Sequence, residues 1–403
     1  MNLSEFINNI SSGSFDEQFR MLYGSSERAV LRARARYLNT AERFSREYPE
    51  SGDISVFSAP AQIVAGGVRC QGCRVLLAAV SLDMIAIVSF HEQGIIRIKS
   101  DALEAMEVKL GCTEAAKKKQ AGYGELIRSI AERFGKKGVE TGGFDAYISS
   151  DIPAGKGFGE LAAFEVLAGA VINAGFGGRY EGAEIAETVR AAETECFGKP
   201  ERAPEQLTSA LGGFVLTDIS PRHIELDLER SGYSVCMTDA SGDSAERGDI
   251  SNDIFCVAKA MGAELLGEVN EEEYHDKLPE LRRLCSDREL LSAAYFFAEN
   301  ETASDEADAL SDGDTERFFE LADRSGSACT ELCSCDEGVV LGAALSRRFL
   351  GGNGAVRVQD GMIQAFLPSY LAEDYVKEME RVFGYGSCCI LTVRNTGVRP
   401  LAL

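Results

Sequence analysis

The sequence has no basic stripe and no long apolar run, and each absence argues against a class of function. Its 403 residues include 41 lysines and arginines against 64 aspartates and glutamates, a formal net charge of -23. This negative charge is spread over the whole chain and would repel a phosphate backbone, so we do not expect nucleic-acid binding. No apolar run approaches the roughly 20 residues of a membrane span, which argues against a membrane protein.

The amino-terminal segment also lacks the features of an export signal. MNLSEFINNISSGSFDEQF has acidic residues where a signal peptide needs lysine or arginine. We therefore expect a cytoplasmic protein that binds a small molecule or a protein, and the sequence names no protein partner.

The twelve cysteines lack the spacing of a metal site. Close pairs occur at Cys70 and Cys73, at Cys333 and Cys335, and at Cys388 and Cys389. None has a second pair with histidines at zinc-site spacing, so we expect no structural metal. In a chain of this size without an export signal, cysteines are more often reduced core residues than disulfides.

What is present predicts an ordinary globular protein of two domains or one bilobed unit, with 45% apolar and 26% charged residues. Apolar residues at helical spacing predict helices over 26–48 and 115–137. β-branched runs predict a meander-like sheet over 54–100 and a strand at 144–152. Strands and helices are segregated rather than alternating, which favours an α+β fold.

Two acidic segments rich in serine, glycine or alanine interrupt this pattern, at 239–253 and 298–316. Runs of like charge are usually solvated. We therefore predict that both segments are solvated loops or helix ends.

A glycine-rich turn enters an alanine-rich helix in SSDIPAGKGFGELAAFEVL, residues 149–167, with glycines at Gly155, Gly157 and Gly159. Such a turn exposes backbone N–H groups at the positive end of a helix dipole and so can bind an anion. However, Lys156 is followed by glycine, and the G-x-G-x-G spacing matches neither standard nucleotide motif. A tight turn with Glu160 as a helix-start acid is the alternative reading.

This turn resembles that of the galactokinases, in the GHMP superfamily of small-molecule kinases. That family has a strand, a Pro or Ser, G-x-G-L-S-S-S-A-A and a helix, and DIPAGKGFGELAAFEVL follows the frame without a gap. The three serines fall on Gly159, Glu160 and Leu161. The resemblance implies a bilobed α+β fold with mixed or antiparallel sheets, divided into domains 1–212 and 213–403, with the remnant nucleotide site between them.

A second matching segment, AETECFGKPERAPEQLTSALGGFVLTD, covers residues 192–218. It is similar to the galactokinase stretch with A-E, F-G-x-P and S-x-x-G-G. The resemblance implies that Glu193 occupies the position of the magnesium-binding glutamate. The catalytic aspartate falls on Glu205, and Pro204 replaces the preceding methionine.

Two further segments resemble the family but have lost its polar residues. FSAPAQIVAGGVRCQGCRVLLAAVSLD, residues 57–83, has Gln62 at the signature arginine and lacks the acid, histidine and aspartate that hold the sugar. GAVRVQDGMIQAFLP, residues 354–368, keeps only Gly361 of a second glycine-rich turn. The segments LNTAERFSREYP and GSCCILTVRNTGVRPL also match, so the likeness covers nearly the whole chain.

The resemblance implies Mg-ATP as cofactor and ATP-dependent phosphorylation of galactose at its anomeric hydroxyl. Replacing the arginine by Gln62 removes a stabilising charge, a loss that commonly lowers the rate by about a hundred- to a thousandfold. A Glu160 carboxylate about 4 Å from a phosphate oxygen would repel it by roughly 4 kcal/mol. We therefore predict weak or lost kinase activity, with Glu160 itself filling the anion site and a sugar- or nucleotide-binding role remaining.

An active, divergent sugar or small-metabolite kinase is the alternative. In that reading Glu205 is the general base, and Glu193 and Glu160 jointly hold magnesium. It also remains open that these residues have no part in a site. Glu205 and Glu193 would then be ordinary helix residues, and Lys156 would be a solvated lysine in the turn.

Overall fold

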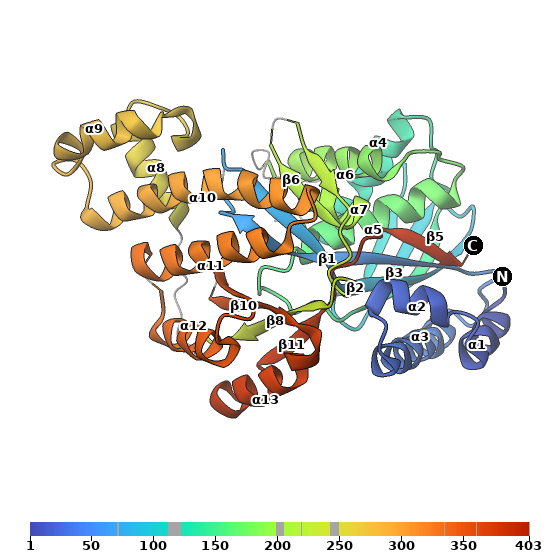
Figure 1. The fold of residues 1–403 in the computed structure, drawn as a ribbon. Helices are drawn as coiled ribbons and strands as arrows, with labels where there is room; N and C mark the ends of the chain where they lie inside the picture. Colours follow the sequence, from blue (N-terminus) through green and yellow to red (C-terminus); the bar gives the residue numbers. More distant parts are fainter. Residues whose placement is uncertain are drawn as a thin grey trace. The chain divides into compact units, whose positions relative to one another are not determined.

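The computed structural model describes residues 1–70, 72–111, 122–198, 205–218, 220–241, 250–333, 335–359 and 361–402 (Figure 1). Contacts divide the chain into two compact units. Unit 1 comprises Met1–Ile63, Ala79–Gly213 and Arg394–Leu403, and unit 2 comprises Val64–Ala78 and Phe214–Val393. The division into domains 1–212 and 213–403 stays a prediction.

The sheet of unit 1 has the strand order β12-β1-β2-β5-β3-β4. These strands are β1 (Ser55–Gly67), β2 (Val75–Phe90), β3 (Ile95–Ser100), β4 (Met106–Lys109), β5 (Phe144–Ser150) and β12 (Arg399–Ala402). β3 pairs in parallel with β5 rather than with β2. The predicted meander over 54–100 is therefore wrong, because β5 returns later in the sequence and lies between β2 and β3.

Helices cover both faces of this sheet (Figure 1). The helices α1 (Leu3–Ser12), α2 (Asp16–Tyr23) and α3 (Glu27–Glu47) bury phenylalanines and tyrosines against one face. On the opposite face lie α4 (Tyr123–Lys136), α5 (Glu160–Gly175) and α6 (Gly182–Phe197), with the short α7 (Glu205–Leu211) against α5 and α6.

The predicted helix over 26–48 is confirmed as α3. Ser26 caps it by accepting a hydrogen bond from the Ala29 amide at 3.2 Å. The helix predicted over 115–137 is seen as α4 from Tyr123, while residues 112–121 lie outside the described part of the chain.

A buried carboxylate, Asp83 of β2, connects distant parts of unit 1. It accepts hydrogen bonds from the hydroxyl of Tyr23 at 2.6 Å and from Ser58, and it forms ion pairs with Arg36 and Arg394. Asp83 and Arg394 are both fully buried. These bonds join α2, α3, β1 and the carboxy-terminal segment to β2 at a single side chain.

The Asp83 backbone extends this network to the glycine-rich turn. Its amide donates to Asp151 Oδ1 at 2.8 Å, and Asp151 follows directly after β5. Burial raises the pKa of the Asp151 carboxyl to about 6, although Arg36 opposes the shift. The first residue of the turn is therefore fixed to the sheet.

Unit 2 has an antiparallel sheet in the order β11-β8-β10-β9. Its strands are β8 (Tyr233–Asp239), β9 (Ala355–Gln359), β10 (Met362–Pro368) and β11 (Cys388–Leu391). Two more strands, β6 (Phe214–Thr217) and β7 (Arg222–Ile224), pair with each other, and β6 pairs with the first residues of β2.

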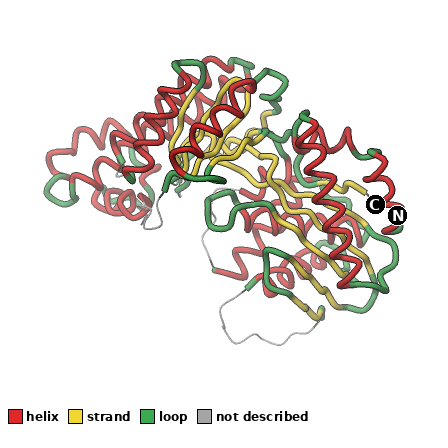
Figure 2. Tube along the Cα trace, turned by 90° about the horizontal axis from the view of Figure 1, so that it is seen from below, coloured by secondary structure: helices red, strands yellow, loops and turns green. Residues whose placement is uncertain are grey.

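The helices of unit 2 are α8 (Ile250–Ala260), α9 (Glu271–Leu281), α10 (Asp287–Ser311), α11 (Thr315–Leu332), α12 (Glu337–Leu350) and α13 (Ala372–Phe383). Single 3₁₀ turns, η1 (Leu266–Glu268) and η2 (Ser369–Leu371), lie between them. In Figure 2, helices lie beside the strands in the described part of the chain. The predicted α+β fold is confirmed.

Most of the acidic segment 298–316 is not a solvated loop. It continues α10 as far as Ser311, and the side chains of Glu299 and Glu306 are 1% and 0% exposed. Their spacing of seven residues places both carboxylates on one helix face, which is turned inward. The predicted solvated loop is therefore wrong for residues 298–311, which form the carboxy-terminal part of α10. Of the other acidic segment, 239–253, residues 242–249 lie outside the described residues.

A buried arginine stabilises these two glutamates by supplying an opposite charge in place of water. Arg357 of β9 pairs with Glu299 at 2.7 Å and with Glu306 at 3.2 Å. Its guanidinium also donates to the carbonyl oxygens of Ala65 at 3.1 Å and Gly67 at 2.7 Å. All members belong to unit 2, so the group is an internal support of that unit.

The charges of this triad are unequal at neutral pH. Burial raises the pKa of the Glu306 carboxyl to about 8, and the attraction of Arg357 only partly offsets the shift. Glu306 is therefore mainly protonated at pH 7, while Glu299 balances the charge of Arg357. A Cβ on Gly66 would overlap the Glu306 carboxyl, so any other residue at that position would displace this carboxyl from its place beside Arg357.

The cysteine prediction fails for one pair, because Cys70 and Cys73 are joined by a disulfide. Nine other cysteines are free thiols in the described part of the chain. None of the helices in the described ranges combines the length and apolar character needed to cross a membrane.

We expect the two glutamates to respond oppositely to amide substitution at pH 7. Glu299→Gln removes the counter-ion of a buried arginine and should lower the free energy of unfolding by about 3 kcal/mol, since Glu306 can ionise in partial compensation. Glu306→Gln mimics the protonated acid and should raise it by about 1–2 kcal/mol. Urea denaturation of both variants measures this, and a larger loss for Glu306→Gln would contradict the assignment.

The same carboxyl should make stability depend on pH. Its folded pKa, about 8, exceeds the ordinary value of 4.5, so its stabilising contribution is complete below about pH 4.5 and is lost as pH rises toward 8. The difference in unfolding free energy between wild type and Glu306→Gln should change by about 1.4 kcal/mol per pH unit between pH 5 and 8. A pH-independent difference would show that Glu306 is ionised throughout.

Candidate functional site

The glycine-rich turn links the end of β5 to the start of α5. Gly155, Gly157 and Gly159 have φ values of 68°, 80° and 68°, in the left-handed region that glycine adopts without strain. A Cβ added to Gly155 would meet no atom within 4 Å, so the turn is open at that point. All three glycines therefore adopt a backbone conformation that other residues rarely take, and there is open space beside Gly155.

Gln62 of β1 lies directly against this turn. Its backbone amide donates to the carbonyl oxygen of Phe158 at 3.0 Å, and a Cβ on Gly159 would overlap the Gln62 side chain. Gln62 is fully buried, and neither polar atom of its side chain has a hydrogen-bond partner among the described residues. A buried amide without partners typically costs about 1–3 kcal/mol, which is the signature of a group kept for a ligand or a water.

A second polar group lies where α5, α6 and α7 meet. The side-chain nitrogen of Gln206 donates to Glu165 Oε2 at 2.7 Å and to Glu193 Oε2 at 3.0 Å. Glu165 is fully buried, in an otherwise apolar stretch of α5. The predicted magnesium residue Glu193 is therefore held by an amide that it shares with a second carboxylate.

Sequence reasoning missed both Glu165 and Gln206. The available signal was one acidic residue inside the apolar run ELAAFEVLAGAVI, since a charge is rarely buried without a partner. Gln206 is the neighbour of the predicted base Glu205, and the sequence alone does not show which of the two points inward.

Glu160 is the first residue of α5, and burial raises the pKa of its carboxyl. Hydrogen bonds from the turn's amides would instead lower that pKa, as would the positive end of the helix dipole. Burial, together with the nearby charges of Glu160 and Glu165, also raises the pKa of Tyr123 in α4. The region is therefore negatively charged, and the role of Glu160 as a substitute for phosphate stays a prediction.

The remaining predicted residues are more dispersed. Glu205 is the first residue of α7, and Pro204 lies outside the described residues. Lys156 is partly buried within the glycine-rich turn. Gly361 belongs to unit 2, where it precedes β10 with φ of 74°. In unit 1 the structure brings Gln62 to the turn and joins Glu193 to α5 and α7.

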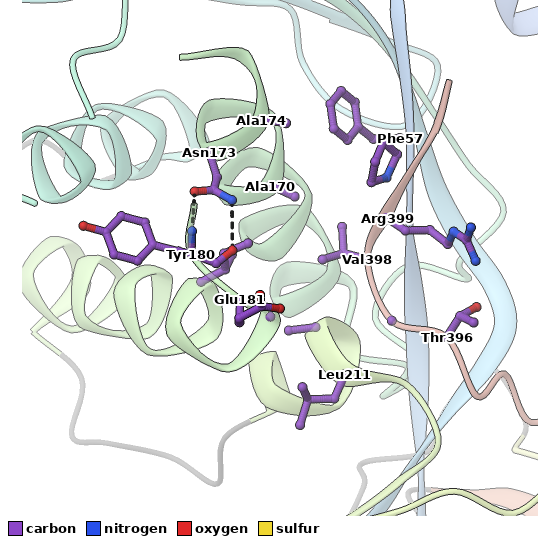
Figure 3. A pocket seen from close by; sticks show the side chains of 15 residues that line it. Phe57, Ala170, Asn173, Ala174, Tyr180, Glu181, Leu211, Thr396, Val398 and Arg399 are labelled. Atoms are coloured by element: carbon purple, nitrogen blue, oxygen red, sulfur yellow. Dashed lines mark hydrogen bonds between the residues drawn. The ribbon is translucent and has the colours of Figure 1, made fainter. Parts of the chain in front are cut away.

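Unit 1 also contains a pocket of about 440 Å³ (Figure 3). Figure 3 shows Asn173 of α5 bonded to the backbone of Tyr180, with nitrogen-to-oxygen distances of 3.0 and 3.2 Å, which closes one wall. The pocket is lined by Phe57, Ala170, Asn173, Ala174, Tyr180, Glu181, Gly182, Ile185, Ala210, Leu211, Thr396, Gly397, Val398, Arg399 and Pro400. None of the predicted site residues lines it, so it is separate from the candidate site.

The residues present suit a nucleotide only in part. The turn offers backbone donors to an anion, and Glu165 and Glu193 supply the oxygen ligands that magnesium prefers. However, the Gln206 amide already binds both carboxylates. Among the described residues, no three or more His, Cys, Asp or Glu side chains are grouped so as to hold a metal ion. Magnesium would have to displace Gln206.

Comparison with known proteins supplies an independent line of evidence. Residues 124–213 match the family described as the GHMP kinases N terminal domain. The chain is 27% identical over 287 residues to a galactokinase of Streptomyces lividans, an alignment covering 66% of this chain and 71% of that protein. It is 21% identical over 360 residues to a galactokinase of Lacticaseibacillus casei, covering 84% and 92%.

Solved structures with the same fold include two kinases. The structure of Lactococcus lactis galactokinase complexed with galactose has a TM-score of 0.72 at 18% identity and covers 89% of this chain and 98% of that chain. The mevalonate kinase of Methanococcus jannaschii has a TM-score of 0.63 at 14% identity, covering 85% and 99%. At these identities the likeness establishes the fold.

Two glutamine substitutions should separate a ligand-binding amide from a structural one. Gln62→Met removes a buried amide without partners and should raise the free energy of unfolding by about 1 kcal/mol. Gln206→Met leaves two carboxylates facing each other, one of them buried, and should lower it by about 2 kcal/mol. Thermal and urea unfolding measure both changes. Equal losses for the two variants would mean that Gln62 is a structural amide.

Proposed function

Because the chain is a galactokinase-like member of the GHMP kinase superfamily, we propose that it keeps a small-molecule site but carries out phosphoryl transfer weakly or not at all. The family reaction is ATP-dependent phosphorylation of galactose at the anomeric hydroxyl. In this proposal the retained activity is binding of a sugar or a related hydroxyl-bearing metabolite.

The observation that carries the proposal is the uncharged, buried side chain of Gln62 against Gly159. Resemblance to the family places an arginine at this position. Phosphoryl transfer depends on positioning and on cations that stabilise the charge of the moving group. An amide offers one weak donor group in place of a charged, forked one, so the transition state loses a principal stabiliser.

The charge around the helices adds to this loss. Glu165 and Glu193 share one amide, and Glu160 and Glu165 both raise the pKa of Tyr123. A triphosphate would bring several negative charges to this region, where each repulsion at about 4 Å is worth roughly 4 kcal/mol at an effective dielectric near 20. A neutral polyhydroxyl ligand meets no such repulsion, and its hydroxyl groups can both donate to and accept from the Gln62 amide.

The pair Glu165 and Glu193 also favours a second candidate function. If the Gln206 amide were displaced, the two carboxylate oxygens that it binds could serve as ligands for magnesium. An active, divergent kinase would then use Glu193 with Glu160 or Glu165 for the metal and Glu205 as general base. This candidate requires nucleotide binding, and the first does not.

We expect the wild-type protein to show little turnover of ATP with galactose and little thermal shift with MgATP. Gln62→Arg combined with Glu160→Ser restores a cation and removes a carboxylate, so MgATP should then raise the melting temperature. A ligand present at 100 times its dissociation constant stabilises the folded state by about 2.7 kcal/mol. Differential scanning fluorimetry with MgATP, and a coupled assay for ADP release, measure the two effects.

Gln62→Arg combined with Glu187→Ser is the matched control, because Glu187 is an exposed acid on α6. It keeps the new arginine and removes an acid elsewhere, so it should gain less nucleotide binding than the variant that changes Glu160. Rapid ADP release by the wild-type protein, abolished by Glu193→Gln, would contradict the proposed function and support the divergent kinase.

A further inference from the structure

Three cysteines gather at the carboxy-terminal end of α11, in unit 2. We propose that Cys329 and Cys335 form a dithiol that peroxides oxidise to a disulfide in the folded protein. Cys333, between them in the sequence, remains a free thiol in this reaction. The inference does not depend on the proposed function.

The path of the chain brings the two sulfur atoms together. α11 ends at Leu332, and the amide of Cys333 donates to the carbonyl oxygen of Cys329 at 3.0 Å. The amide of Cys335 donates to the carbonyl oxygen of Cys333 at 2.9 Å. The two sulfurs of Cys329 and Cys335 are 3.9 Å apart. A disulfide requires about 2.05 Å, so a shift of about 2 Å in a short turn completes the bond.

The surroundings favour a reaction at Cys329. The thiols of Cys333 and Cys335 lower the pKa of the Cys329 thiol, with Tyr295 and Arg357 contributing and burial opposing. The negative end of the α11 dipole also opposes ionisation, but it is a smaller effect than direct hydrogen bonds to the sulfur. Cys329 is itself buried, but Cys333 and Cys335 beside it are only partly buried, so hydrogen peroxide can approach the group from their side.

The reaction balances with hydrogen peroxide as the oxidant. The Cys329 thiolate attacks one peroxide oxygen, the O–O bond breaks, and hydroxide leaves with a proton as water, giving a sulfenic acid. The sulfur of Cys335 then attacks the sulfur of Cys329, the S–O bond breaks, and a second water leaves with the Cys335 proton. Two thiols lose two electrons, and one peroxide is reduced to two waters.

A second pair of cysteines in unit 2 provides an internal comparison. Cys236 of β8 and Cys388 of β11 interact with each other but are both buried, and Thr238 donates to the Cys388 sulfur at 3.1 Å. The hydrogen bond between the two thiols raises the pKa of Cys236, as does burial, and lowers the pKa of Cys388. A buried thiol without access reacts slowly. If closeness of the two sulfurs were sufficient, both pairs would be oxidised. If the oxidant must also reach them, only Cys329 and Cys335 are oxidised.

The test uses the full chain treated with a small molar excess of hydrogen peroxide, then alkylated under denaturing conditions and digested with trypsin. Residues 325–347 form one tryptic peptide that contains Cys329, Cys333 and Cys335. Before oxidation it should carry three alkyl groups, and afterwards only one, on Cys333, with the mass of the chain reduced by two hydrogens. Reduction with dithiothreitol should restore all three sites.

In Cys335→Ser the sulfenic acid at Cys329 has no Cys335 sulfur to attack it, so the peptide should gain one oxygen at Cys329 instead of losing two hydrogens. Cys333→Ser should leave formation of the disulfide intact. Cys256→Ser, at an exposed thiol of α8 outside this group, is a control that should change nothing in this peptide. Circular dichroism before and after oxidation confirms that the protein stays folded. The proposal is overturned if the peptide keeps three alkylated thiols, if Cys329 instead pairs with Cys333, or if Cys236 and Cys388 are oxidised as fast.

Discussion

The carboxylate of Asp83 is the interaction on which unit 1 depends most. A fully buried acid is costly unless charged partners and hydrogen bonds surround it, and here Arg36 and Arg394 come from opposite ends of the sequence. Through Ser58 and Tyr23 the same side chain fixes β1 and α2. Its backbone fixes Asp151, so the glycine-rich turn starts from a rigid position. The position of the candidate site is therefore set by Asp83, which is not itself part of the site.

Both units surround buried charged side chains with polar partners, but they differ in how the negative charge left unbalanced is dealt with. In unit 2 Arg357 binds two glutamates, and the surplus negative charge is removed because Glu306 keeps its proton at neutral pH. In unit 1 the pair Glu165 and Glu193 has a neutral amide between its members in place of a cation. Gln62 adds a buried amide whose polar atoms lack partners among the described residues. In unit 1, therefore, an amide beside the turn is buried without a partner among the described residues.

Much of this arrangement could be predicted from local pattern, and the failures share a cause. The periodicity of α3 and the strand, turn and helix around Gly157 were readable because each depends on neighbouring residues. The position of β5 between β2 and β3 depends on pairing between residues some fifty positions apart in the sequence. The residues of β5 and their neighbours do not indicate this pairing. The acidic part of α10 was misread because its solvation is decided by Arg357, a residue far along the chain. The same holds for Gln206, whose inward orientation depends on α5 and α6.

The place of Arg394 in unit 1 has a consequence for how the protein is made. Its guanidinium neutralises Asp83, and β12 completes the edge of the sheet beside β1, yet both follow the whole of Phe214–Val393 in the sequence. During translation, which delivers the amino-terminal part first, unit 1 therefore waits with a buried acid lacking one of its two arginines. Once Val393 has been made, by contrast, all residues of unit 2 are present. Unit 1 is therefore completed by a segment that is made only after the whole of Phe214–Val393.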